Sequence, residues 1–255
     1  MQLIDSHCHL DLDPFEVDRN AVIQRAADHQ VTDIIVPAVM ASTWTDLQSL
    51  TQLAAPVNIH AAYGLHPVFD SQHQPDDIDR LDRCLATNHC VAVGECGLDF
   101  FIEEYDQSSQ MRYFTEQLDL AVTHKLPVII HSRKSLDLVL RELRLRPSLS
   151  GVVHSFSGSP QQAKQLIDLG FYLGFGGPIT YPRATKLRKL VTELPLDALL
   201  LETDAPDQPD IERRGQRNEP FWLSNIAKCV AELRQCSLKT VCDITTKNSQ
   251  QLFSI

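Results

Sequence analysis

The stretch Gln2-Leu3-Ile4-Asp5-Ser6-His7-Cys8-His9-Leu10-Asp11 decides the fold class of this sequence. It opens with a short run that is typical of a buried strand and passes directly into a turn that contains two histidines. An open, doubly wound sheet is the alternative α/β arrangement, and its first turn would be rich in glycine. Residues 7–11 contain no glycine, so the first turn favours a closed barrel.

Seven more strand-like segments follow this one, and their starts lie roughly 20 to 36 residues apart, the length of one β/α unit. Several, such as Ile34-Ile35-Val36 and Leu199-Leu200-Leu201, are continuous aliphatic runs, as expected for parallel strands covered on both faces. The predicted strands are residues 2–6, 33–37, 58–63, 91–95, 127–131, 151–154, 171–175 and 199–202. The sequence therefore predicts a TIM-type (β/α)8 barrel that fills residues 1–255 as a single domain.

Helical periodicity fills the gaps between these strands. In residues 107–125, apolar side chains recur three and four positions apart, and Ser159-Pro160 is a typical helix start. The predicted helices include residues 107–125, 161–169, 220–234 and 238–252.

The composition indicates an ordinary globular protein, with 43% hydrophobic and 22% charged residues. The formal net charge of −10 argues against a broad basic surface that grips a nucleic-acid backbone. It does not exclude a phosphate substrate, because bound cations reverse the charge inside a site.

The N-terminus lacks the basic start and apolar core of a signal peptide, and no apolar run is long enough to span a bilayer. The seven cysteines are odd in number and form no C-x-x-C pair, which is typical of free thiols in a reducing compartment. We therefore expect a cytoplasmic protein without a membrane partner. Cys8 is predicted to point away from the side that His7 and His9 share.

The chemistry begins at the end of the first strand, in His7-Cys8-His9. Residues i and i+2 of a strand point to the same face, so both imidazoles can reach one cation. Such a pair can also be two solvent-facing histidines, but four other predicted strands likewise finish in a metal-ligating residue after an apolar run. These residues are Glu95, His131, His154 and Asp204. In a barrel all strand ends converge at one mouth, where such enzymes keep their sites.

Six ligands exceed the need of one tetrahedral site and suit two divalent cations about 3.5–4 Å apart. Glu95 is the natural bridge, His7, His9 and Asp204 complete one site, and His131 and His154 belong to the other. Imidazole and carboxylate ligands favour Zn²⁺, Mn²⁺, Co²⁺ or Fe²⁺ over Ca²⁺, and Mg²⁺ stays open. A bound cation lowers the pKa of water from 15.7 to about 7, and Asp204 is expected to orient this water and take its proton.

Seven ordered motifs carry a resemblance that runs the length of the chain. They are Asp5-Ser6-His7-Cys8-His9-Leu10, Gly64-Leu65-His66-Pro67, Val93-Gly94-Glu95-Cys96-Gly97-Leu98-Asp99, Pro127-Val128-Ile129-Ile130-His131-Ser132-Arg133, Val153-His154-Ser155-Phe156-Ser157-Gly158, Leu201-Glu202-Thr203-Asp204-Ala205-Pro206 and Arg217-Asn218-Glu219-Pro220. The sequence resembles the TatD family of metal-dependent deoxyribonucleases, within the amidohydrolase superfamily. The resemblance implies a TIM-type barrel, Asp204 as the residue that activates water, and hydrolysis of phosphodiester bonds in DNA. Phe100 departs from the tyrosine that the family pattern has after Gly-Leu-Asp.

Four residues are candidates for substrate binding. The resemblance implies that His66 contacts a substrate phosphate, although it is also a turn residue ahead of Pro67. Arg133 follows the fifth strand and can bind phosphate oxygens. Arg217 and Glu219 either take part in the site or pair with each other or with their loop. Lys134 either joins Arg133 or begins a solvated helix.

Three functions follow from this reading. The first is a metal-dependent phosphodiesterase for which DNA is a substrate rather than a stable partner. The second uses the same centre on an amide, ester or lactone. The third is a binding protein that kept the fold, and the complete ligand set disfavours it.

Overall fold

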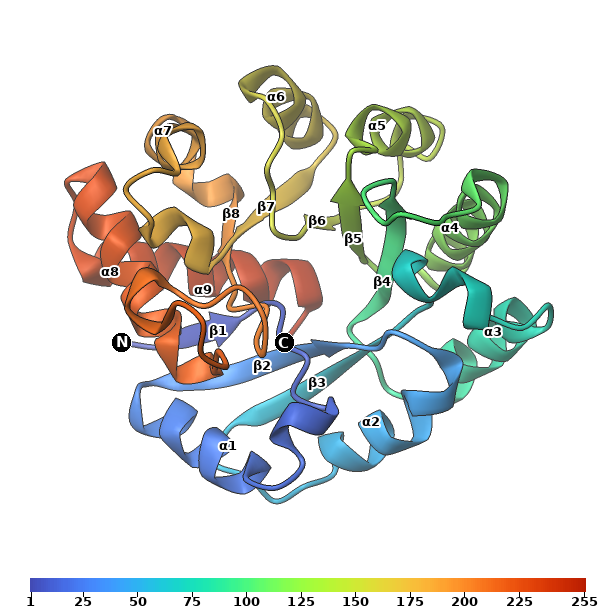
Figure 1. Cartoon of the computed structure of the whole chain (residues 1–255), viewed down its shortest axis with the longest axis horizontal. Helices are drawn as coiled ribbons and strands as arrows, with labels where there is room; N and C mark the ends of the chain where they lie inside the picture. The colour runs from blue at the N-terminus through green and yellow to red at the C-terminus, as the bar shows by residue number, and fades with distance from the viewer. The chain divides into compact units, whose positions relative to one another are not determined.

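The computed structural model describes all 255 residues and contains eight strands, numbered β1 to β8, which neighbour one another in sequence order. The strand pairs β1–β2, β3–β4, β4–β5, β5–β6 and β7–β8 are parallel. Helices alternate with the strands along the chain (Figure 1). The fold is thus the TIM-type (β/α)8 barrel that the sequence predicts.

The bounds of the elements follow the predicted strands and helices closely. The strands are β1 Leu3–Asp5, β2 Val31–Pro37, β3 Asn58–Tyr63, β4 Ala92–Asp99, β5 Val128–Arg133, β6 Gly151–Val153, β7 Phe171–Phe175 and β8 Leu199–Leu201. The α-helices are α1 Arg19–Asp28, α2 Trp44–Thr51, α3 Asp77–Thr87, α4 Gln107–His124, α5 Leu136–Arg144, α6 Pro160–Asp168, α7 Thr185–Glu193, α8 Leu223–Arg234 and α9 Leu238–Phe253.

The chain forms two compact units. Unit 1 comprises Met1–Val36, Leu50–His60 and Leu173–Ile255, and unit 2 comprises Pro37–Ser49 and Ala61–Tyr172. Each unit is described separately below. That residues 1–255 act as one domain stays a prediction.

In unit 2, β4 is longer than the sequence indicates. We expected it to end at Glu95, but it continues to Asp99 alongside β5, with a register shift between Val93 and Cys96. Gly97 permits this pairing, because a Cβ atom there would lie 2.0 Å from the carbonyl oxygen of His131 and the backbone φ is +147°. Only glycine adopts such a conformation at so close an approach. The extension brings four further residues of β4, Cys96 to Asp99, beside the end of β5.

In unit 1, the last helix, α9, forms hydrogen bonds to the segments where β1 and β8 begin. The hydroxyl of Thr246 on α9 donates to the carbonyl of Gln2 over 2.9 Å. The side-chain amide of Asn248 donates to the carbonyls of Leu196 (3.0 Å) and Leu199 (2.8 Å), so α9 satisfies backbone groups that would otherwise be buried without partners.

The helix starts mostly agree with the sequence. Ser159 and Gln162 form a capping box at α6, and Asp106 caps α4 by accepting hydrogen bonds from the backbone amides of Ser108 and Ser109. The helix predicted from residue 220 begins later, because Pro220–Trp222 forms a 3-10 turn ahead of α8.

All seven cysteines are free thiols, and Cys8 is completely buried. Burial raises the pKa of the Cys8 thiol well above its usual value. No helix combines the length and apolar character needed to cross a membrane.

Candidate metal centre

Three predicted ligands of unit 1 come from the loops that follow β1 and β8. We expected His7 and His9 to lie on a strand, but β1 ends at Asp5. Their positions are set instead by backbone hydrogen bonds between the two loops. The amide of Asp204 donates to the carbonyl of His7 over 2.9 Å, and the amide of His9 donates to that of Ala205 over 2.8 Å. Hydrogen bonds between the two loops, and not strand alternation, therefore direct His7 and His9 toward one point.

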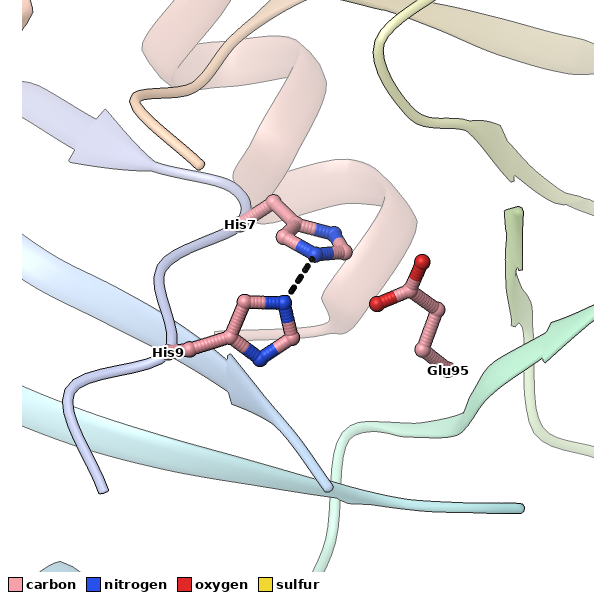
Figure 2. A group of neighbouring side chains, drawn as sticks. All are labelled: His7, His9 and Glu95. Carbon is pink, nitrogen blue, oxygen red and sulfur yellow. Dashed lines mark hydrogen bonds between the residues drawn. The ribbon is translucent and has the colours of Figure 1, made fainter. Parts of the chain in front are cut away.

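The donor atoms of these three residues converge. The Nε2 atoms of His7 and His9 lie 3.2 Å apart, as the dashed line in Figure 2 marks, and Asp204 Oδ1 lies 3.5 and 3.6 Å from them. Two atoms bound to one ion at about 2.1 Å lie roughly 3.0 to 3.4 Å apart at octahedral and tetrahedral angles. The spacing therefore fits three ligands of one divalent cation.

Asp204 itself is held in an uncommon backbone conformation. Its φ is +54°, in the left-handed region that Asp tolerates better than most residues. The side-chain amide of Gln208 donates to Asp204 Oδ2. The buried Asn218 donates to the carbonyls of Thr203 and Asp207, each over 2.9 Å, and so fixes the loop on both sides of Asp204. One carboxylate oxygen therefore faces the histidines while the other is oriented by Gln208.

Asp5 accepts hydrogen bonds from both of these loops. Its carboxylate accepts hydrogen bonds from the Thr203 hydroxyl (2.6 Å) and amide (2.9 Å) and from the amide of His7 (3.3 Å). Complete burial raises the pKa of Asp5 to about 7 in the protein without bound cations. Asp5 therefore ties the loop after β8 to the loop after β1.

A second donor set forms within unit 2 around one oxygen of Glu95. Glu95 Oε1 lies 3.1 Å from His66 Nε2, 3.0 Å from His131 Nδ1 and 2.8 Å from His154 Nε2. His131 Nδ1 and His154 Nε2 lie 3.2 Å apart. The structure thus gathers Glu95, His131 and His154, as the sequence predicts, and adds His66 to them.

His66 points its Nε2 atom at Glu95 because its other nitrogen is engaged. The backbone amide of Val68 donates to His66 Nδ1 over 3.1 Å, so the proton of the neutral ring resides on Nε2. The two interpretations of His66, as a turn residue and as a site residue, are therefore compatible. His66 begins the turn at Pro67 and also reaches Glu95. Its contact with substrate phosphate stays a prediction.

Asp99 is a site residue that the sequence reasoning missed. Its buried carboxylate accepts a hydrogen bond from His131 Nε2 over 2.9 Å. Burial alone would raise the pKa of Asp99, but its contact with His131 lowers it, so the carboxylate is ionised and can only accept. The other nitrogen, Nδ1, lies 3.0 Å from Glu95 Oε1 and is the atom of His131 available to a cation. Carboxylates in this position orient metal-binding histidines.

We expect Asp99→Asn to weaken metal binding without unfolding the protein. Asparagine keeps the shape of the side chain and removes the charge that fixes the His131 tautomer, and such partners contribute about 10- to 100-fold in metal affinity. Isothermal titration of the metal-free protein with Mn²⁺ measures the effect. Asp119→Asn, an exposed carboxylate on α4, is the control. Equal affinities in all three proteins would remove Asp99 from this role.

Arg217 and Glu219 lie in an ion-pair network of unit 1. Arg217 donates to both carboxylate oxygens of Asp18 at 2.8 Å, to Glu219 Oε1 at 2.8 Å and to the carbonyl of Pro14 at 2.6 Å. These bonds use all four terminal N–H groups of the guanidinium. Glu219 Oε2 accepts from Arg25 Nε over 2.8 Å. The alternative that the two residues pair with each other and their surroundings is therefore shown, and a contact with substrate stays a prediction.

We expect Arg217→Gln to lower stability by about 1–3 kcal/mol, since it leaves charged partners of hydrogen bonds unmatched. Hydrogen bonds from Arg217 hold the pKa of Asp18 at about 2, below its usual 3.8. A lowered carboxylate pKa stabilises the fold above pH 4 and loses that effect as pH falls toward 2. In urea titrations between pH 5 and 2, the free energy of unfolding of the variant should therefore depend less on pH than that of the wild type. Unchanged stability together with a raised KM for substrate would instead assign Arg217 to the site.

Arg133, the remaining predicted contact, ends β5 two residues beyond His131. Its side chain is half exposed, and Nη1 lies 3.8 Å from Asp99 Oδ2. The guanidinium therefore stays accessible to a ligand at the end of β5.

Glu202 follows β8, and its buried carboxylate lies against β7. A Cβ atom on Gly174 would lie 2.2 Å from Glu202 Oε2. The absence of a side chain at Gly174 thus makes room for the Glu202 carboxylate.

Imidazole and carboxylate donors gathered at strand ends of a (β/α)8 barrel define a metal-dependent hydrolase. Comparison with known proteins assigns the family within this class. The family model of the TatD related DNases matches residues 4–254, and the chain belongs to this family.

Two relatives are similar over their whole length. The sequence is 41% identical to the uncharacterized metal-dependent hydrolase YjjV of Escherichia coli (strain K12), covering 100% of this chain and 98% of the relative. It is 34% identical to the uncharacterized metal-dependent hydrolase YabD of Bacillus subtilis (strain 168), covering 99% of each. The crystal structure of the TatD homologue YjjV matches with a TM-score of 0.94 over 99% of this chain and 98% of that chain, at 40% identity. A TatD family hydrolase of Entamoeba histolytica shares the fold, with a TM-score of 0.85 over 99% of this chain and 98% of that chain at 22% identity.

Proposed function

We propose that this hydrolase is a phosphodiesterase that acts on DNA with two divalent cations, Zn²⁺, Mn²⁺ or Mg²⁺. The observation that carries the proposal is that each unit gathers its own donor set at metal-ligand spacing. His7, His9 and Asp204 form one set, and Glu95 with His131 and His154 forms the other. The barrel fold supports their meeting as one binuclear centre, because parallel strands of a barrel end at a common mouth.

In this proposal Glu95 would hold both cations; its Oε1 atom lies within 3.1 Å of three histidine nitrogens. His66 donates its Nε2 proton toward Glu95 and is an additional side chain for the substrate. Asp99 holds His131 with Nδ1 toward the centre. Bound cations would supply Lewis acidity and lower the pKa of a water from 15.7 to about 7.

Asp204 is the general base of the proposed reaction. Its Oδ1 atom faces the histidine pair while Gln208 orients Oδ2, so the carboxylate can hold a water molecule and take its proton. The water oxygen adds to phosphorus, and the bond from phosphorus to one deoxyribose oxygen breaks. The proton passes from Asp204 to that leaving oxygen. Arg133 is placed to pair with a phosphate oxygen.

The DNA substrate is supported by the family and by the positively charged side chains of Arg133 and Lys134 at the end of β5. The same centre would also suit an amide, ester or lactone, and the net charge of −10 favours a small substrate over a long polyanion. Incubation of the Mn²⁺-loaded protein with end-labelled single- and double-stranded DNA, beside a panel of esters, lactones and amides, separates these functions. Release of nucleotides by the wild type and not by Asp204→Asn supports the proposal. Turnover of a panel compound with intact DNA would replace it with the second function.

A further inference from the structure

An aromatic ring flanked by two cations stands out on unit 2. Phe101 is 54% exposed, although phenylalanine is normally buried. The guanidinium carbon of Arg133 lies 4.2 Å from the centre of the ring, and the ammonium nitrogen of Lys134 lies 4.6 Å from it. We call Phe101, Arg133 and Lys134 the Phe101 cluster.

Backbone hydrogen bonds, rather than burial of the ring, hold this cluster in place. The amide of Phe101 donates to Asp99 Oδ1 over 2.8 Å, and the amide of Phe100 donates to the carbonyl of Arg133 over 2.9 Å. The neighbouring ring of Phe100 stacks on Tyr105 with centroids 5.0 Å apart and planes at 21°. The segment that carries Phe101 is therefore fixed to the ends of β4 and β5 while the ring itself faces solvent.

The cluster is connected to the second donor set by direct contacts. Asp99 accepts from the Phe101 amide with one oxygen and from the metal-ligand candidate His131 with the other. Arg133 lies two residues beyond His131 along β5. A group bound on the Phe101 cluster would therefore lie next to a substrate bound at the second donor set.

Resting on the proposed function, we propose that the Phe101 cluster is a subsite for one unpaired nucleotide of the DNA substrate. The base stacks on the surface formed by the Phe101 ring and the Arg133 guanidinium, and its phosphate pairs with Arg133 and Lys134. Bases stack on aromatic rings and on guanidinium planes alike, and cationic side chains beside them bind the backbone. A base stacked between its neighbours inside a duplex does not offer a free face.

Asp99 is the acidic residue in contact with the cluster: its Oδ2 atom lies 3.8 Å from Arg133 Nη1 and offsets part of the Arg133 charge. Glu104 and Asp106 line a separate cavity of about 460 Å³, together with Asp70 and Tyr105. The carboxylate of Asp106 is further occupied in capping α4. Arg133 and Lys134 thus give the exposed ring a local positive character on a protein of net charge −10.

The test is equilibrium binding of a short single-stranded oligonucleotide that carries 2-aminopurine, whose fluorescence falls when the base stacks. The Mn²⁺-loaded Asp204→Asn protein serves as background so that the probe stays intact. We expect Phe101→Ala to weaken binding about 5- to 100-fold and to abolish the quenching, because stacking on one aromatic side chain contributes about that much. Phe101→Trp should keep or strengthen both signals.

Leu145→Ala is the matched control, since Leu145 is a large apolar side chain of the same unit that is 69% exposed beyond α5. In the otherwise wild-type protein, Phe101→Ala should raise KM for the oligonucleotide and leave KM for an oligonucleotide of abasic residues unchanged, because that substrate has no aromatic group to stack. Equal affinity and quenching for Phe101→Ala and the background protein would overturn the subsite. Binding and quenching that depend on Phe101, without any phosphodiester hydrolysis by the wild type, would overturn the proposed function and leave the subsite standing.

Discussion

Asp204→Asn should abolish phosphodiester hydrolysis while the protein stays folded and still takes up metal. Asparagine keeps an oxygen near His7 and His9, but it cannot accept a proton from water at neutral pH. Loss of a positioned general base costs about 10²- to 10⁴-fold in rate, and weaker binding of the cation at the histidine pair adds to it. Steady-state hydrolysis of end-labelled DNA and of methyl p-nitrophenyl phosphate measures kcat for both proteins.

Asp197→Asn is the matched control, because Asp197 is an exposed carboxylate just before the opposite end of the same strand, β8. It should match the wild type in kcat and in metal content. A kcat for Asp204→Asn within a few-fold of the wild type would remove Asp204 from the role of base, whatever the substrate. The buried surroundings of Asp204 keep the variant interpretable, since Asn218 still holds the loop on both sides of residue 204.

Glu95→Gln should have the second largest effect, on metal content as well as on rate. Three histidine nitrogens lie within 3.1 Å of Glu95 Oε1, so the carboxylate supplies the negative charge of that donor set. A neutral amide cannot offset the charge of two cations. We expect the metal content measured by plasma mass spectrometry to fall from two ions per chain to one or none.

Thermal unfolding with and without Mn²⁺ provides an independent measurement. A ligand at 1,000 times its Kd stabilises the folded state by about 4 kcal/mol, and Glu95→Gln should lose most of this effect. Glu232→Gln, at an exposed position of α8, should keep it. Full stabilisation by metal in Glu95→Gln would show that Glu95 is not a ligand.

The sequence predicted six ligands, and each of the two units brings its share of them together. The sequence could single out these residues because a barrel strand is a short apolar run, and the polar residue after it is visible in the sequence; that they bind metal stays a prediction. The reason given for His7 and His9 was nevertheless wrong. The two residues lie beyond β1, and hydrogen bonds to the loop after β8 align them instead of strand alternation.

Asp99 was missed because the fourth strand was ended at Glu95. Glu95, Gly97 and Asp99 alternate with apolar residues, and this period of two was the available signal that the strand continues. The partner of Asp99 could not be inferred in the same way. It depends on the register that places Gly97 beside His131 and Asp99 beside Arg133.

By itself, the sequence determined the barrel, the order of its strands and the candidate ligands, because these depend on local hydrophobic patterns and on which residues follow them. Only the tertiary structure decided how those side chains are supported. Arg217 meets Asp18 across 199 positions of the chain, and Thr203 meets Asp5 across 198. Such partners are fixed by the packing of distant loops, whose hydrogen bonds leave no periodic trace in the sequence.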